Sequence, residues 1–220
     1  MEKEARLYVH KSWFIMPEGV LALGSNISLM LNASVSTTLD QALLRGSVHV
    51  GLVGEKSSIL PEGAHVLKGL DYISHANMTY VLDVASTQTV PSFRVRNTIV
   101  NGSWSSINSA ASSALLALKT LTIEADHGNA PKNASYAYAV LPNTPLTSVD
   151  AVLRNFRQGV RVVSQNDAVH AVLYSLGGND VLVASAFGTG LVKGGPGWTA
   201  NVRTGSSVWI LSWNGPSSKC

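Results

Sequence analysis

The chain has 220 residues, of which 45% are hydrophobic and only 13% are charged, and its net charge is +3. This length and hydrophobic content are enough to bury a core, which excludes intrinsic disorder, and the single cysteine, Cys220, excludes an internal disulfide. Ser, Thr and Asn occur 27, 13 and 14 times, which is typical of β-rich secreted proteins, so an all-β fold is expected.

Short segments rich in Val, Ile, Leu, Tyr and Thr recur between clusters of Gly, Pro, Asn and Ser, which predicts a large antiparallel β-sandwich. Hydrophobic residues alternate clearly with polar or small ones over 120–126 and 136–140, as expected for strands with one buried face. The strands expected in this part are Leu7–Met16, Val20–Asn26, Ser47–Val53, Met78–Val84, Phe93–Val100, Ser113–Ala125 and Ser135–Leu141.

One segment has helical spacing instead, which predicts a short helix over Thr147–Gln158. Thr147 and Asp150 are spaced as a capping box at its start, and Gly159 is its stop signal. We therefore expect a central β-sandwich domain over residues 1–145, a helical linker over 146–159, and a smaller C-terminal antiparallel β-sandwich over 160–220. The strands expected after the helix are Val160–Ser164, Ala168–Ser175, Asp180–Ala186, Thr199–Thr204 and Ser207–Trp213.

Several function classes have no signal in the sequence. No apolar run approaches 18 residues and no Lys/Arg block occurs, so neither a membrane nor a nucleic-acid partner is expected. The six histidines lack ligand spacing, and the common nucleophile, zinc and phosphate-loop motifs are absent, so no metal and no cofactor are expected. The opening residues 1–6 lack the apolar region of a signal peptide.

Asn-x-Ser/Thr sequons occur about twice as often as chance predicts. In a secreted eukaryotic protein, these asparagines would lie at accessible turns or strand ends and some would carry glycans. The alternative is that a Ser-rich chain produces such triplets by chance. The five candidate glycosylation sites are Asn26, Asn32, Asn77, Asn101 and Asn133.

Two charged pairs lie two residues apart on predicted strands, so each pair shares one face. Glu124 and Asp126 are paired carboxylates such as glycoside hydrolysis needs, or else part of a solvated strand face. Arg94 and Arg96 are placed either to bind a sugar carboxylate or to face solvent.

The segment from His127 to Asn133 is predicted to be a polar loop between two strong strands, where binding residues often lie. It offers donors to carboxylates and hydroxyls, and the strand that follows adds two tyrosines on one face. The alternatives are a turn-stabilising histidine and tyrosines that pack in the core. The candidate carbohydrate-binding residues are His127, Asn129, Lys132, Tyr136 and Tyr138, and five tryptophans (Trp13, Trp104, Trp198, Trp209 and Trp213) could stack on sugars.

Four ordered blocks between residues 11 and 143 resemble the central β domain of polysaccharide lyase family 8, which includes hyaluronate, chondroitin AC and xanthan lyases. The blocks are Lys11-Ser12-Trp13-Phe14, Ala22-Leu23-Gly24-Ser25-Asn26-Ile27, Thr37-Thr38-Leu39-Asp40-Gln41 and the run from His127 to Asn143. Residues 160–213 would correspond to the small C-terminal β domain of that family.

The resemblance implies an extracellular enzyme that cleaves uronate-containing polysaccharides by β-elimination. In the family, the catalytic Asn, His, Tyr and Arg lie on an N-terminal α/α toroid that has no counterpart in this sequence. No catalytic residue is therefore carried over, and whether the chain is an enzyme is left open.

The leading hypothesis is the β-sheet portion of a secreted lyase for hyaluronan, chondroitin or glucuronan, present within a longer precursor or as a fragment, and inactive without the toroid. The competing hypothesis is a stand-alone, lectin-like carbohydrate-binding or structural module derived from the lyase fold. A third is a new enzyme that uses Glu124, Asp126 or His127.

Overall fold

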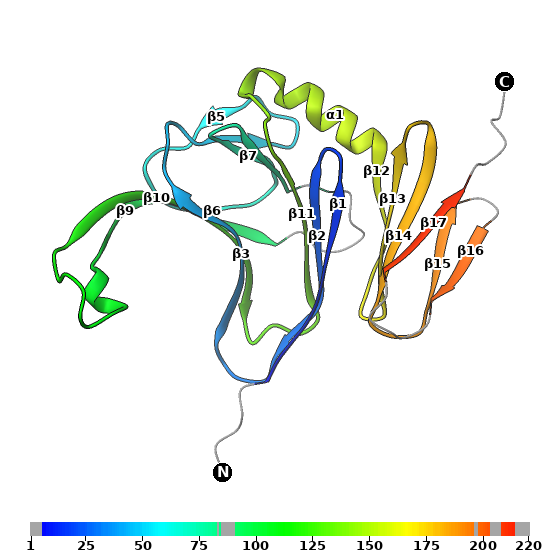
Figure 1. Ribbon diagram of the computed structural model, residues 1–220, viewed down its shortest axis with the longest axis horizontal. Helices are drawn as coiled ribbons and strands as arrows, with labels where there is room; N and C mark the ends of the chain where they lie inside the picture. Colours follow the sequence, from blue (N-terminus) through cyan, green and yellow to red (C-terminus); the bar gives the residue numbers. More distant parts are fainter. Residues whose placement is uncertain (1–5, 83, 85–90, 196–197, 203–207, 214–220) are drawn as a thin grey trace, which may run out of the picture.

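The structure, a computed structural model, describes residues 6–82, 84, 91–195, 198–202 and 208–213 of the chain. Strands dominate it, and all strand pairs are antiparallel, as the sequence predicts. Two sheets stack into a large sandwich, a helix lies along one side, and two smaller sheets follow at the right of Figure 1. The all-β prediction with one short helix is confirmed.

Sheet A is seven-stranded, in the order β1-β2-β11-β8-β7-β4-β5. Its strands are β1 (Leu7–Met16), β2 (Gly19–Leu29), β4 (His49–Leu52), β5 (Ser58–Ile59), β7 (Leu70–His75), β8 (Met78–Val81) and β11 (Ala134–Leu141). Sheet B has the order β3-β10-β9-β6. Its strands are β3 (Ser34–Leu43), β6 (Gly63–Leu67), β9 (Ser92–Gly102) and β10 (Leu116–Asn129).

The core of the large sandwich lies between sheets A and B. On β10, Leu121, Ile123 and Ala125 are fully buried while Glu124 and Asp126 face outward, so the predicted alternation is confirmed for this strand. Strand β11, also predicted to have one buried face, is instead buried on both faces because it lies between two cores. The three buried residues of β10 pack against apolar side chains of sheet A, among them Ile73 and Tyr80. Burial of this apolar area stabilises the fold by about 25 cal/mol per Å².

A second core lies on the other face of sheet A. Helix α1 (Val149–Gly159) contributes Val149, Leu153 and Phe156 to this core. These side chains pack with Leu21 and Leu23 of β2. The helix therefore packs against the sandwich, and an ion pair between Arg157 and Asp71 of β7 adds to this contact.

The predicted capping box is wrong. A 3-10 turn, η2 (Leu146–Ser148), precedes the helix, and the N-cap is Ser148 without a side-chain cap bond. The Ser148 hydroxyl instead donates to the carbonyl of Pro145, at 2.9 Å. Pro145 lies in the extended region, and the 3-10 turn that follows it delays the first α-helical residue to Val149. The helix ends at Gly159, the predicted stop signal, one residue beyond the predicted end at Gln158.

A smaller sandwich follows the helix. Sheet C has the order β12-β13-β14-β17 and sheet D pairs β15 with β16, and a third core that includes Val169, Ala171, Leu182 and Val192 lies between them. The strands are β12 (Val160–Gln165), β13 (Val169–Leu176), β14 (Asn179–Ala186), β15 (Gly190–Gly195), β16 (Trp198–Val202) and β17 (Val208–Trp213). No helix among the described residues is long and apolar enough to cross a membrane.

His170 of β13 joins the small sandwich to sheet A. It is fully buried, with its Nδ1 2.6 Å from the Ser12 hydroxyl and its Nε2 2.8 Å from the Ser25 hydroxyl. Because Ser25 donates its only hydroxyl hydrogen to the Asn166 carbonyl, it accepts from Nε2–H, and Ser12 then donates to Nδ1. These bonds assign a neutral imidazole.

Gln165 makes a second polar link between the two parts. Its side-chain amide donates to the carbonyl of Gly24 at 3.0 Å and to that of Tyr136 at 2.7 Å. Both bonds are buried, and both acceptors belong to central strands of sheet A.

Acidification is expected to weaken the folded state through His170. Burial, with a smaller contribution from His10, lowers the pKa of His170 from 6.5 to about 4. The unfolded chain therefore binds a proton between these pH values that the folded chain does not, and about 3 kcal/mol of stability is lost as the pH falls through this range. Urea unfolding at a series of pH values measures this loss. The free energy of unfolding should depend less steeply on pH in His170→Asn, which has no titrating ring. Equal pH slopes in the two proteins would contradict the assignment of this loss to His170.

Candidate functional site: the margin between strands β1 and β3

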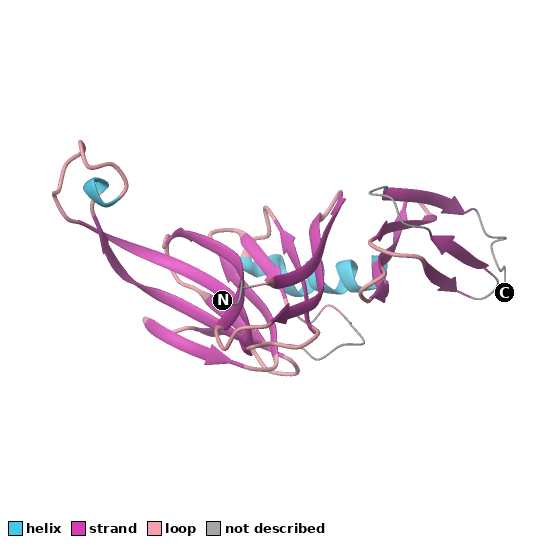
Figure 2. Ribbon diagram, turned by 90° about the horizontal axis from the view of Figure 1, so that it is seen from below, coloured by secondary structure: helices cyan, strands magenta, loops and turns pink. Residues whose placement is uncertain are grey.

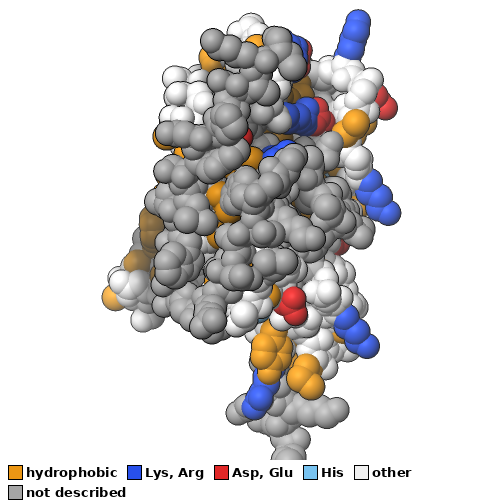
Figure 3. Space-filling view, turned by 90° about the vertical axis from the view of Figure 1, so that its right-hand side faces the viewer, with side chains coloured by type: hydrophobic (Ala, Val, Ile, Leu, Met, Phe, Trp, Pro, Cys, Tyr) orange, Lys and Arg blue, Asp and Glu red, His pale blue; other side chains and the backbone are white. Residues whose placement is uncertain are grey.

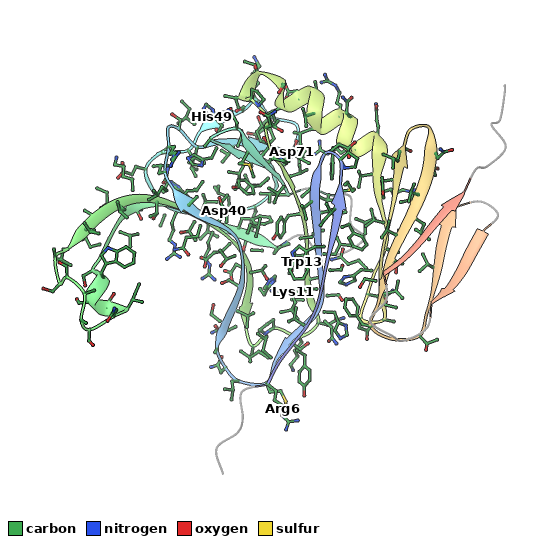
Figure 4. All side chains as sticks on the ribbon, in the orientation of Figure 1. Arg6, Lys11, Trp13, Asp40, His49 and Asp71 are labelled. Atoms are coloured by element: carbon green, nitrogen blue, oxygen red, sulfur yellow. The ribbon has the colours of Figure 1, made fainter. Side chains whose placement is uncertain are left out.

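Part of the inner face of sheet A is uncovered at the edge strand β1. Trp13 lies opposite Ala22, which lies opposite Tyr138, and these positions share the face that meets sheet B. Tyr138 is buried there, whereas Trp13 is 60% exposed and Lys11, two residues earlier, is also exposed. Figure 4 shows Lys11 and Trp13 on β1 and Asp40 across from them on β3. We call this region the β1–β3 margin.

Gly24 shapes the floor of the margin. A Cβ atom at this position would lie 2.2 Å from Cε1 of Tyr136, so only glycine leaves room for that ring. Tyr136 and Tyr138 are both buried, with their ring centroids 5.7 Å apart, and burial raises the pKa of each phenol. Both tyrosines are thus core residues, the alternative that the sequence left open.

His127 lies beside Tyr136 at the inner end of the margin. The structure places it near the end of strand β10, half-buried, with its Nε2 2.9 Å from the Thr37 hydroxyl. Burial lowers its pKa, opposed by Asp126 and reinforced by Lys11, so the ring is neutral at pH 7. No described residue hydrogen-bonds to its buried Nδ1. His127 therefore has one ring nitrogen without a partner among the described residues, and that atom is buried.

Asn129 is exposed at the end of β10, and Lys132 is exposed on the turn that joins β10 to β11. This turn is held against the β2–β3 connection by hydrogen bonds from the amides of Leu29, Ala130 and Asn133, each of 2.9–3.0 Å. No hydrogen bond to His127 from either residue occurs in the described part of the chain. Of the five predicted binding residues, only His127 and the two tyrosines are brought together.

Sequence reasoning missed Lys11 as a site residue and named Trp13 only as one of five tryptophans that could stack on sugars. The signal that could have found them is the alternation within β1, where Ser12, Phe14 and Met16 are buried and the residues between them are exposed. A groove of about 420 Å³ also runs beside this strand, lined by Lys11–Ile15 and by Tyr174, Val183 and Ser185 of sheet C. On the face shown in Figure 3, the described Lys and Arg side chains stand apart from one another.

A second pocket, of about 330 Å³, is lined by residues of sheet B, of sheet A and of the loop after β3. The Tyr80 hydroxyl donates to Oδ2 of Asp40 at 2.5 Å, and the Arg45 amide donates to Nε2 of His75 at 2.9 Å. Burial raises the pKa of Tyr80 and lowers that of His75, so both are neutral at pH 7. The Asp40–Tyr80 bond joins the two sheets, and Met78 lines the same pocket.

The arginine pair on β9 and the carboxylate pair on β10, both singled out from the sequence, form ion pairs with each other. Arg94 lies 3.4 Å from Asp126 and 4.0 Å from Glu124, and Arg96 lies 3.3 Å from Glu124. The pairing of β9 with β10 places Arg94 directly opposite Glu124. Hence these side chains form an ion-pair ladder on the outer face of sheet B, which favours the solvated-face alternative over a carboxylate pair or a uronate clamp.

Four of the five sequon asparagines are exposed, and Asn26 is half-buried. Asn26, Asn77 and Asn133 have positive φ values, a conformation that asparagine tolerates better than most residues. Asn77 occupies a two-residue hairpin turn between His75 and Met78. Backbone geometry thus accounts for three of these asparagines, and glycosylation stays a prediction.

The five tryptophans do not form one surface. Trp13 lies at the margin, and Trp104 lies at the tip of the β9–β10 hairpin. Trp198, Trp209 and Trp213 lie on β16 and β17, where the side chains fall outside the described set, and Cys220 lies outside the described residues altogether. Within the described part, no group of three or more His, Cys, Asp or Glu side chains could hold a metal ion.

Known proteins resemble the chain both in sequence and in fold. Hyaluronate lyase HylB of Enterococcus faecalis is 30% identical over 175 residues, which is 76% of this chain and 16% of that protein. Chondroitinase-AC of Pedobacter heparinus is 27% identical over 182 residues, 78% of this chain and 25% of that protein. The chain therefore spans a quarter or less of the length of these two relatives.

Solved structures share the same architecture. Paenibacillus xanthan lyase superposes with a TM-score of 0.73 at 22% identity, over 86% of this chain and 19% of that one. A chondroitinase AC lyase, from a study of enzyme–oligosaccharide complexes, superposes with a TM-score of 0.73 at 21% identity. The match covers 85% of this chain and 26% of that one. Residues 1–153 match the polysaccharide lyase family 8 super-sandwich domain. The chain therefore belongs to polysaccharide lyase family 8, of which it carries the super-sandwich domain.

Proposed function

We propose that this chain is the β-sheet portion of an extracellular lyase for uronate-containing polysaccharides, and that it binds the glycan without cleaving it. The observation that carries the proposal is its family membership through the super-sandwich domain, combined with its coverage of 16% to 25% of its relatives. Those relatives are a hyaluronate, a xanthan and a chondroitin lyase.

The β1–β3 margin is the surface that we assign to glycan contact. The exposed ring of Trp13 offers an apolar face for a pyranose, and the Lys11 ammonium offers a charge partner for a uronate carboxylate. The half-buried ring of His127 borders this surface beside Tyr136. Asn129 and Lys132 would extend this contact along the neighbouring turn.

Weaker glycan binding is the result expected when the margin is altered. In calorimetric titrations with hyaluronan and chondroitin oligosaccharides, Trp13→Ala and Lys11→Ala should each raise Kd about tenfold, since tenfold corresponds to about 1.4 kcal/mol. His127→Ala and Lys132→Ala should have smaller effects. Matched controls are Trp104→Ala, an exposed tryptophan on the far hairpin, and Lys68→Ala, an exposed lysine. Equal affinity in the margin and control variants would overturn the assignment.

The chain alone should not catalyse β-elimination. The family's acid–base residues lie on a toroid that this sequence does not contain, and proton transfer requires partners within hydrogen-bond reach of one proton. Incubation with hyaluronan, chondroitin and glucuronan should give no rise in the ultraviolet absorbance of unsaturated uronate. A rise that survives Asp40→Asn and Tyr80→Phe but vanishes in His127→Ala would instead support the new-enzyme hypothesis.

A stand-alone, lectin-like module is the second candidate, favoured by the exposure of Trp13 beside Lys11. The coding sequence upstream of Met1 discriminates between the two. A toroid in the same transcript supports the lyase portion, and a natural start at Met1 supports the module. Extracellular location is part of either proposal, and glycans on secreted material would support it through the exposed sequons.

A further inference from the structure

The outer part of the β9–β10 hairpin projects away from the rest of the molecule. We define it as the arm, residues 98–118, formed by the ends of β9 and β10 and by the short helix η1 (Trp104–Ser106) at the tip. Figures 1 and 2 both show the arm standing clear of the sandwich. A two-stranded ribbon that extends alone into water is marginally stable, so its surface calls for a partner.

The arm contains no charged residue. From Asn97 to Leu118 the sequence has no Asp, Glu, Lys, Arg or His, although Arg96 and Lys119 flank it directly. A surface without cations does not fit an acidic polysaccharide, which requires charge partners. The arm is therefore separate from the glycan contact proposed above.

One face of the arm is an apolar groove of about 270 Å³. Val100 lies opposite Leu118, and Leu116 lies opposite Gly102, so these positions share this face. The tip adds Trp104 and Ile107, which are 61% and 81% exposed. Large apolar side chains gathered in this way mark protein interaction sites far more often than ordinary surface does.

Within the described residues, neither edge of the arm has a neighbouring strand. On one side β6 pairs with β9 only as far as Asn97, and on the other β3 pairs with β10 only from Thr120. Beyond these points, no described strand pairs with the outer backbone edges of the ribbon. Such edges readily accept another strand.

We propose that the arm is the dimerisation surface of this chain and that a second copy of the arm occupies it. Two identical neutral faces meet around a two-fold axis without charge repulsion, despite the net charge of +3 on each chain. At the root of the arm, Arg94 and Arg96 are already paired with Glu124 and Asp126, so the tip of a partner meets no net charge there. Antiparallel contact of the two ribbons covers both apolar grooves and extends the sheet across the axis.

Sedimentation velocity of the complete chain tests the proposal, over loading concentrations from about 1 µM to about 100 µM. The wild-type chain should pass from monomer to dimer in this range. Leu118→Lys and Ile107→Lys place a cation in each of the two facing grooves and should raise the dimer Kd at least about tenfold. The matched control is Val66→Lys, an exposed apolar position on the same face of sheet B but outside the arm, which should leave Kd unchanged.

Circular dichroism of each variant checks that the fold is retained, as expected for exposed positions. The proposal is overturned if the wild-type chain stays monomeric throughout, if Val66→Lys weakens association as much as Leu118→Lys does, or if open-ended aggregates form instead of a dimer. Binding of monomers to neutral phosphatidylcholine vesicles through the arm, without dimers, would also overturn it. Because the arm carries no proposed glycan contact, failure here leaves the glycan titrations unaffected.

Discussion

Replacing His170 with alanine is expected to lower the free energy of unfolding by about 3–4 kcal/mol. The imidazole is fully buried, and both ring nitrogens are hydrogen-bonded to serine hydroxyls of sheet A. Its removal leaves a cavity against Phe187, whose ring packs edge-on against the imidazole with the two ring centroids 4.9 Å apart. It also leaves the buried Ser12 hydroxyl without its imidazole acceptor. The loss combines a cavity cost with the cost of an unsatisfied polar group.

Urea unfolding of the complete chain at pH 7 measures this effect, followed by circular dichroism in the β-sheet region. His65→Ala is the matched control, because His65 makes only an exposed bond to the Pro61 carbonyl, and it should cost less than about 0.5 kcal/mol. Similar losses in the two variants would show that His170 does not join the small sandwich to sheet A. A changed m-value in His170→Ala alone would indicate that the two parts unfold separately.

A side chain at Gly24 is expected to destabilise the fold by about 3 kcal/mol, even when it is only the methyl of alanine. The added carbon would lie 2.2 Å from Cε1, 2.6 Å from Cζ and 2.7 Å from Cδ1 of Tyr136. That ring is buried among core residues and packs against Tyr138 and His127, so it has little freedom to move aside. The methyl group therefore forces a shift of the ring or of strand β2.

A double-mutant cycle with Tyr136→Leu separates this clash from other causes. Tyr136→Leu alone should cost about 2–3 kcal/mol through the cavity it leaves, but the double variant should be more stable than the sum of the two losses predicts. Gly102→Ala is the control, since a Cβ there has no neighbour within 4 Å, and it should change stability by less than about 0.5 kcal/mol. Additive losses in the cycle would refute the steric explanation.

The all-β class and the one-sided burial of β10 are determined locally, although the sequence predicted no strand at β3, β6 or β7 and did not predict that both faces of β11 are buried. The alternation around Leu121 and Ile123 predicted which residues are buried, because side chains alternate between the faces of any strand. Helix α1 was found for a similar reason, since its apolar residues recur at helical spacing. Its start was predicted wrongly because Pro145 and the 3-10 turn after it set the first α-helical residue, and the capping motif did not reveal this.

The candidate site was decided by tertiary structure. His127 could be singled out from its sequence neighbours, but the contact of Tyr136 with Gly24 and the pairing of Arg94 with Glu124 depend on which strands lie side by side. Trp13 is 60% exposed although it shares its face of sheet A with the buried Ala22 and Tyr138, because the inner face of the sheet is uncovered at that point of β1. Local periodicity assigns a residue to a face of its strand, whereas only the packing of distant strands determines whether that face is covered.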